Sequence, residues 1–181
     1  MAAHMNYYSN IRADYGYISG LLNAYCECLI NDKLNTEKRL DIELVSKDLD
    51  PDFIKAFKKR LYKYDQIDEK AYEGPDTCRD LTLNDKFAEL RLDLNLDKDL
   101  SQGKYAKIVN ILNMPKDQDG LESLLAKIQG QLGQLKQAYW LGPLDDKTKK
   151  ILAGYYSYII FDAYLLEYKD YWLCLILGSN A

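Results

Sequence analysis

An aspartate and several tyrosines near the C-terminus are the side chains whose types and spacing could do chemistry. In a helix, Tyr155 and Tyr158 would lie one or two turns before Asp162 on the same side, and Tyr164 follows two residues later. Burial would raise the pKa of the Asp162 carboxyl, whereas phenolic hydrogen bonds would keep it charged. These four residues are therefore the ligand-binding candidates. The alternative is an acid at the rim of the core, tied to Lys169.

Histidine chemistry is excluded once the N-terminus is set aside. Residues 1–5 are typical of an expression-vector remnant and include His4, the only histidine. Without it, no imidazole triad can form. The chain also lacks the G-x-G-x-x-G and Walker A patterns of nucleotide sites. We therefore predict no catalytic residue and no cofactor.

Metal binding is also not expected. Asp93, Asn95, Asp97 and Asp99 have the spacing of a calcium loop, but Lys98 and Lys104 stand where that loop has its glycine and its bidentate glutamate. No C-x-x-C pair occurs among the four cysteines, which disfavours structural zinc. Buried free thiols are favoured, with disulfides in an exported protein as the alternative; the cysteines are Cys26, Cys28, Cys78 and Cys174.

The charge and hydropathy of the chain constrain its partners and its location. The formal net charge of −4 disfavours nucleic acid and favours a more basic protein partner. The longest uncharged apolar stretch, Ile151–Phe161, is shorter than the roughly 18 residues that a membrane span needs. No signal peptide is visible, so we favour a cytoplasmic location, with an exported or periplasmic one as the alternative if a signal peptide is missing.

Apolar residues recur at helical spacing along much of the chain. Ile11, Ile18 and Leu29 belong to one stripe, and Leu121, Leu125 and Leu132 belong to another. Asp50-Pro51-Asp52 is a helix start with Asp50 as N-cap. Aromatic residues on several faces predict that the last helix is surrounded by others. The predicted helices are Ser9–Ile30, Asp50 to about Tyr64, Ser101–Met114, Asp119–Tyr139 and Asp146–Leu177.

Two segments alternate leucine or isoleucine with polar residues, a pattern that also suits a strand. They are residues 39–45 and 91–97. Because leucine favours helices over strands, we predict helices there, with a two-stranded ribbon as the alternative. The two segments also echo each other in sequence, which suggests duplicated helical hairpins, although common capping residues would produce the same echo.

Two clusters on the predicted helices are candidate contact surfaces. Small residues at Gly16 and Gly20 predict a close helix contact, either inside the bundle or with a second copy in a homodimer. A basic cluster around Arg60, opposite the apolar side of its helix, is interpreted as a solvated face that could alternatively dock on an anionic surface.

These patterns predict an all-α fold, in which residues 6–181 form a single-domain bundle of about six or seven helices. No motif identifies a family, although the tyrosine-rich C-terminal segment resembles small helical bacterial immunity proteins; no site residue is carried over from them. We predict a non-enzymatic protein-binding module, an acidic antagonist or immunity-type inhibitor of a more basic protein. The alternatives are a tyrosine-lined small-ligand pocket and a carboxylate enzyme with Asp162 as its base.

Overall fold

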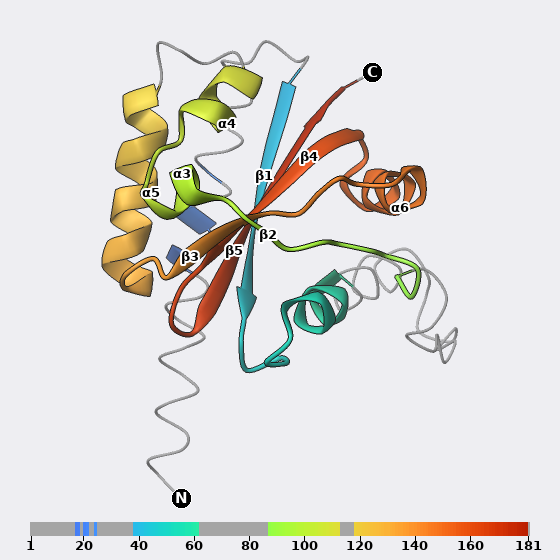
Figure 1. The fold of residues 1–181 in the computed structure, drawn as a ribbon, viewed down its shortest axis with the longest axis horizontal. Helices are drawn as coiled ribbons and strands as arrows, with labels where there is room; N and C mark the ends of the chain where they lie inside the picture. The colour runs from blue at the N-terminus through green and yellow to red at the C-terminus, as the bar shows by residue number, and fades with distance from the viewer. Residues whose placement is uncertain are drawn as a thin grey trace, which may run out of the picture.

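The fold is that of a computed structural model, in which residues 17–18, 20–21, 24, 38–61, 87–112 and 118–180 are described. A helix at 53–61 lies between the first two labelled strands. Figure 1 shows the labelled elements in space. In chain order they are β1 (Lys38–Ser46), β2 (Asn95–Leu96), α3 (Lys98–Ser101), α4 (Ala106–Ile111), α5 (Gln118–Leu132), β3 (Gln137–Trp140), α6 (Asp146–Tyr156), β4 (Ile159–Glu167) and β5 (Tyr171–Ser179).

The strands form one antiparallel sheet of five strands in the order β1-β5-β4-β3-β2. β5 pairs along its whole length with β1 on one side and with β4 on the other. Its residues from Trp172 to Gly178 are all buried. A strand that is covered on both faces has a nearly continuous apolar run instead of an alternating one, and this is the pattern of β5.

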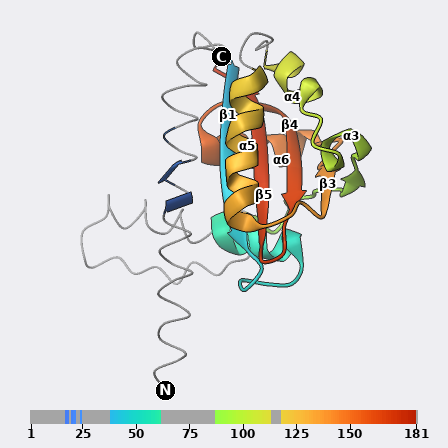
Figure 2. The same cartoon turned by 90° about the vertical axis from the view of Figure 1, so that its left-hand side faces the viewer.

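Helices cover both faces of this sheet. α3, α4 and α5 lie on one side of it, and α6 and helix 53–61 lie on the other (Figure 1). Figure 2 shows α5 running along the sheet, with α4 and α3 beside it. We call the α5 side face one, with a core that includes Leu40, Leu125, Ile128, Tyr164 and Leu175. We call the α6 side face two, with a core that includes Phe57, Leu152, Leu165, Trp172 and Ile176.

The predicted all-α bundle of six or seven helices is therefore wrong. The largest error concerns Asp146–Leu177, which begins as the predicted helix but ends as α6 at Tyr156. Ser157 follows in the left-handed conformation (φ 61°), and the remainder forms β4 and β5. Aromatic residues on several sides of this segment do not surround a helix. Phe161, Tyr164 and Trp172 lie instead in strands that are covered by helices on both faces, whereas Tyr155 and Tyr156 lie in α6.

The predicted helix Asp119–Tyr139 is also too long. α5 ends at Leu132, and Gly133 adopts a positive φ of 87°, which glycine accepts without a steric penalty. Tyr139 lies in β3 instead. The apolar stripe is confirmed as far as the helix extends, because Leu125, Ile128 and Leu132 are buried in the face-one core.

The two alternating segments are extended, so the period of two was the better guide. Residues 39–45 lie in β1, where Leu40, Ile42 and Leu44 face the core of face one. Residues 91–94 are without helix, and β2 follows at Asn95–Leu96. The alternative ribbon does not form, because β1 and β2 lie at opposite edges of the sheet. Duplicated helical hairpins are excluded because residues 39–45 form a strand and residues 91–97 contain no helix.

Two shorter predicted helices are partly confirmed. A helix follows Asp50-Pro51-Asp52, but its first turn is capped by Asp52, which accepts a hydrogen bond from the Lys55 amide at 3.1 Å. The predicted helix Ser101–Met114 is interrupted at Gly103, whose φ is 75°, so that α3 and α4 are separate. Residues 62–64 and 113–114 lie outside the described residues.

The predicted N-terminal helix, Ser9–Ile30, lies mostly outside the described residues. Residues 17–18, 20–21 and 24 are helical, and Ile18 is buried in the face-one core. Gly20 is exposed, and among the residues that the structure describes a Cβ there would meet no atom within 4 Å, so none of them makes the predicted internal close contact at Gly20. None of the described helices is both long enough and apolar enough to cross a membrane.

Candidate functional site

The structure divides the four predicted ligand-binding residues between the two faces of the sheet. Tyr155 packs against Phe87 with ring centroids 6.3 Å apart, and the Tyr158 hydroxyl donates to the Ile176 carbonyl at 3.4 Å, both on face two. Asp162 and Tyr164 lie on face one. The structure therefore brings Asp162 and Tyr164 together and separates them from the other two tyrosines.

A β-bulge determines the side of the sheet on which Asp162 lies. Ile160 pairs with Gly178 and Asp162 pairs with Leu177, which leaves Phe161 as the extra residue. Ile160 belongs to the core of face two, whereas Phe161 packs against the core of face one. The in-out alternation of β4 changes phase at this point.

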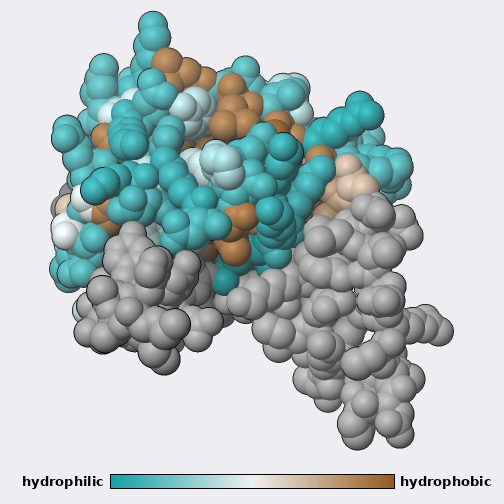
Figure 3. All heavy atoms as spheres, turned by 90° about the horizontal axis from the view of Figure 1, so that it is seen from below, coloured by the Kyte–Doolittle hydropathy of each residue, from teal (hydrophilic) through white to brown (hydrophobic). Residues whose placement is uncertain are grey.

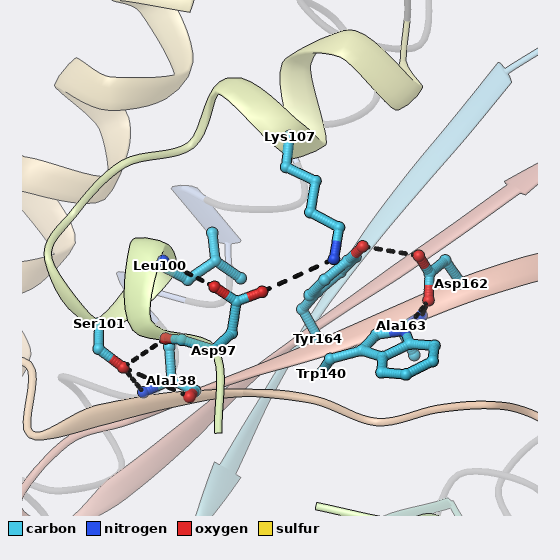
Figure 4. A network of polar contacts seen from close by, with 9 residues as sticks. All are labelled: Asp97, Leu100, Ser101, Lys107, Ala138, Trp140, Asp162, Ala163 and Tyr164. Carbon is cyan, nitrogen blue, oxygen red and sulfur yellow. Dashed lines mark hydrogen bonds and ion pairs between the residues drawn. The ribbon is translucent and has the colours of Figure 1, made fainter. Parts of the chain in front are cut away.

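Asp162 accepts hydrogen bonds from two aromatic side chains (Figure 4). Its Oδ1 accepts from Trp140 Nε1 at 2.5 Å and from the Ala163 amide at 3.0 Å, and its Oδ2 accepts from the Tyr164 hydroxyl at 2.6 Å. Burial, and then the bond to Asp162, raise the pKa of Tyr164, so this phenol stays protonated and donates. One carboxylate therefore fixes the positions of both rings.

A lysine from α4 lies over the same two rings. The ammonium Nζ of Lys107 is 5.7 Å from the ring centroid of Trp140 and 5.2 Å from that of Tyr164. It is also 3.7 Å from Oδ2 of Asp97, whose Oδ1 accepts a hydrogen bond from the Leu100 amide at the start of α3. We call Asp97, Lys107, Trp140, Asp162 and Tyr164 the Asp162 cluster.

A second polar cluster lies on face two. Glu43 of β1 is the cross-strand neighbour of Cys174 in β5, and Arg60 of helix 53–61 donates from Nε to the Glu43 Oε2 at 3.3 Å. The Tyr156 hydroxyl is buried without a hydrogen-bond partner in the described part of the chain. We call Glu43, Arg60, Tyr156 and Cys174 the Glu43 cluster.

Burial dominates the electrostatics of the Glu43 cluster. It raises the pKa of the Glu43 carboxyl even though the Arg60 guanidinium acts in the opposite direction. Burial also raises the pKa values of the Cys174 thiol and the Tyr156 phenol, and the nearby Glu43 adds to both effects. Cys174 is a buried free thiol, as predicted, and it stays protonated. Cys26, Cys28 and Cys78 lie outside the described residues.

The outer edge of the sheet at β2 carries exposed leucines. Leu94 is 41% exposed and Leu96 is 53% exposed. The Asp97 amide donates to the Ala138 carbonyl of β3 at 2.9 Å. Because backbone groups alternate in direction along a strand, the amide and carbonyl of Leu96 point away from β3. We call residues 94–96 the β2 edge.

Sequence reasoning missed several of these residues. Trp140 and Lys107 have no spacing relation to Asp162, since they come from different elements, and no sequence signal connects them. Arg60 was placed on a solvated face, but its side chain is only 10% exposed. Its spacing of three from Phe57 and seven from Phe53 puts it on the apolar side of the helix, which was an available signal.

The described residues hold no group of three or more side chains that could bind a metal ion, and this includes the Asp93–Asp99 segment. No protein-family model matches the chain, and comparisons with curated proteins and with solved structures find no match. The geometry of its own residues is therefore the basis for a functional argument.

Proposed function

We propose that this chain is a non-enzymatic protein-binding module that engages a more basic protein along the β2 edge. The observation that carries the proposal is the exposure of Leu96, on the short strand that ends the sheet, and of Leu94, just before that strand. Large apolar side chains at an open edge favour association, because a partner strand can both bury them and pair with the outward backbone groups.

The charge of the molecule supports a basic partner. The formal net charge is −4, and the exposed Asp93 and Asp99 flank the β2 edge. Complementary charge accelerates association and selects partners more than it adds affinity. In the view of Figure 3, most described residues are hydrophilic and the apolar ones form small separate areas. Two apolar anchors with charged neighbours, the exposed Asp93 and Asp99 beside Arg91 and Lys98, suit a small, salt-sensitive interface better than a large apolar one.

The hydrogen bonds of Asp162 favour a binding role for this chain over catalysis by the Asp162 carboxylate. Its two oxygens accept three hydrogen bonds from the chain itself, out of about four lone-pair directions. A general base needs an oxygen that reaches the proton of a substrate. Here the carboxylate instead holds Trp140 and Tyr164.

The test is recovery of a partner with the wild-type chain and with a variant of the β2 edge. Affinity purification from the native host at low salt should yield a stoichiometric complex that weakens as salt rises. The double variant Leu94→Ser/Leu96→Ser should lose it. Leu49→Ser is the matched control, because Leu49 is 37% exposed in a different loop, and it should retain the complex.

Three outcomes would reject the proposal. The first is that no partner is recovered at low salt. The second is equal recovery by the double variant and by Leu49→Ser, because the β2 edge would then not be the contact. The third is pairing of the edge with a second copy of the chain, detected as a wild-type dimer by size-exclusion chromatography that the double variant abolishes.

A further inference from the structure

The Asp162 cluster surrounds an ammonium group with aromatic faces and a carboxylate. The Lys107 Nζ lies over the rings of Trp140 and Tyr164 and 3.7 Å from a carboxylate oxygen of Asp97 (Figure 4). Ring faces carry negative potential, so a cation within about 6 Å of two ring centroids is attracted to both. Proteins that recognise cations by aromatic side chains use the same combination of groups.

The rings of this arrangement are held in place without help from the lysine. Asp162 accepts a hydrogen bond from each of them, at 2.5 Å from Trp140 and at 2.6 Å from Tyr164. Asp97 is held by the Leu100 amide at the start of α3. A site whose walls are fixed before binding loses little ordering entropy when a ligand enters.

The Lys107 side chain is held less tightly than the rings of Trp140 and Tyr164. Its side chain is 52% exposed, and its ion pair with Asp97 is 3.7 Å long. Water screens the exposed ammonium end of this pair and the long side chain loses entropy in it, whereas the Asp97 side chain is only 13% exposed. α4, which carries Lys107, has six residues and no side-chain hydrogen bond at its N-cap. The rings can therefore stay in place when the lysine leaves, and the cation that replaces it takes over the charge beside Asp97.

We infer that the Asp162 cluster is a binding site for an alkylated ammonium group, and that Lys107 occupies it from within the same chain. A trimethylammonium group carries its charge on methyl surfaces that pack against ring faces, and it needs no hydrogen-bond acceptor of its own. A primary ammonium loses more hydration in such a site. The alkylated cation therefore has the advantage needed to displace Lys107. This site is separate from the proposed function, which concerns the β2 edge.

Tryptophan fluorescence provides the direct test. All proteins carry Trp172→Phe, which leaves Trp140 as the only tryptophan. Tetramethylammonium chloride is titrated against sodium chloride at equal ionic strength. We expect Lys107→Ala to show a saturable change with an affinity at least tenfold tighter than that of the protein that keeps Lys107, because a tethered competitor acts at a high effective concentration.

Lys104→Ala is the matched control. It removes the same charge from a nearby residue whose ammonium pairs with Asp99 at 3.8 Å and does not cover the rings. It should bind tetramethylammonium no better than the protein with both lysines. Asp162→Asn in the Lys107→Ala background should weaken binding at least fivefold, because the amide has one acceptor oxygen for the two ring donors and carries no negative charge, while circular dichroism reports whether this variant is folded.

A measurement on the wild-type chain keeps the test independent of variants. Tetramethylammonium should increase the rate at which an amine-reactive acylating reagent modifies Lys107, relative to Lys104, as followed by peptide mass spectrometry. Choline and the amide of trimethyllysine are then compared, and the tighter ligand tells whether the group belongs to a free small molecule or to a protein side chain.

Two results would overturn the inference. One is the absence of a saturable change in Lys107→Ala. The other is the same affinity with and without Lys107, because the lysine would then not occupy the site. Unchanged reactivity of Lys107 in the wild-type chain at saturating tetramethylammonium would overturn the self-occupancy part alone.

Discussion

The Asp162 cluster and the Glu43 cluster contain the same kinds of group on opposite faces of one sheet. Each has a carboxylate, a basic side chain and a tyrosine. On face one, Asp162 accepts three hydrogen bonds, including one from Tyr164. On face two, the pKa of Glu43 is raised by burial, and the Tyr156 hydroxyl has no partner within the described residues. The cost of burying a carboxylate is therefore offset by the hydrogen-bond donors aimed at it: Asp162 has three, whereas the Arg60 donor does not outweigh the burial of Glu43.

The largest expected effect comes from breaking the pair on face two. Arg60→Met leaves the mostly buried Glu43 without its cation, and removal of one partner from a buried pair is costly. We expect the free energy of unfolding at pH 7 to fall by about 3 kcal/mol. Urea denaturation at pH 7 and pH 5 measures it, and the loss should shrink at pH 5, where Glu43 takes up a proton more readily.

The control for this variant removes both charges. Glu43→Gln combined with Arg60→Met should be more stable at pH 7 than Arg60→Met alone, because no isolated buried charge remains. Equal stability of the two proteins would show that the Glu43 carboxylate is not the source of the loss.

The next largest effect should come from the carboxylate on face one. Asp162→Ala leaves the Trp140 and Tyr164 donors without their acceptor, which we expect to cost about 2 kcal/mol, because unmade bonds of buried donors are expensive. Asp162→Asn keeps an acceptor oxygen and should cost less. Thermal denaturation followed by circular dichroism gives both values, and a loss as large for Asn as for Ala would contradict the role assigned to these bonds.

Two matched tyrosine variants sharpen the contrast further. Tyr164→Phe removes a donor bonded to Asp162 and should cost about 1 kcal/mol. Tyr156→Phe removes a buried hydroxyl without a partner, so stability should be unchanged or rise slightly. Urea denaturation of both variants compares the faces directly. Losses of equal size would mean that the Tyr156 hydroxyl has a bonding partner in solution.

The smallest effect is a dependence of stability on pH. The folded-state pKa of Glu43 lies above its usual 4.5, so the folded state binds this proton more tightly than the unfolded state does. The resulting stabilisation is complete below pH 4.5 and is lost as the pH rises through the folded-state pKa. The wild-type chain should therefore lose stability relative to Glu43→Gln between pH 4.5 and neutral pH in parallel urea titrations. A constant difference over that range would contradict the raised pKa.

Local signals in the sequence located several elements and two residues of the Asp162 cluster, Asp162 and Tyr164. The stripe with Leu125 and Ile128 is buried as predicted, because one face of α5 meets the sheet and the other meets water. Asp50-Pro51-Asp52 precedes a helix, since capping and proline geometry are properties of adjacent residues. Asp162 was singled out because an acid in an aromatic run needs partners, and the structure supplies them.

The tertiary structure decided every feature that depends on how one segment packs or pairs with another. Residues 159–166, apart from Asp162, and residues 171–177 are apolar throughout, and such runs suit a surrounded helix or a strand covered on both faces equally well. Because helices cover both sides of the sheet, these residues form the strands β4 and β5 instead of a helix. Trp140 donates to Asp162, and the pair of Lys107 with Asp97 lies by the same rings, because β3, α4 and the start of α3 converge there. The bulge at Phe161 changes the phase of β4. The periodicity of a segment reports only which of its own side chains are apolar. It therefore does not predict which strand the segment pairs with or which helices pack on it.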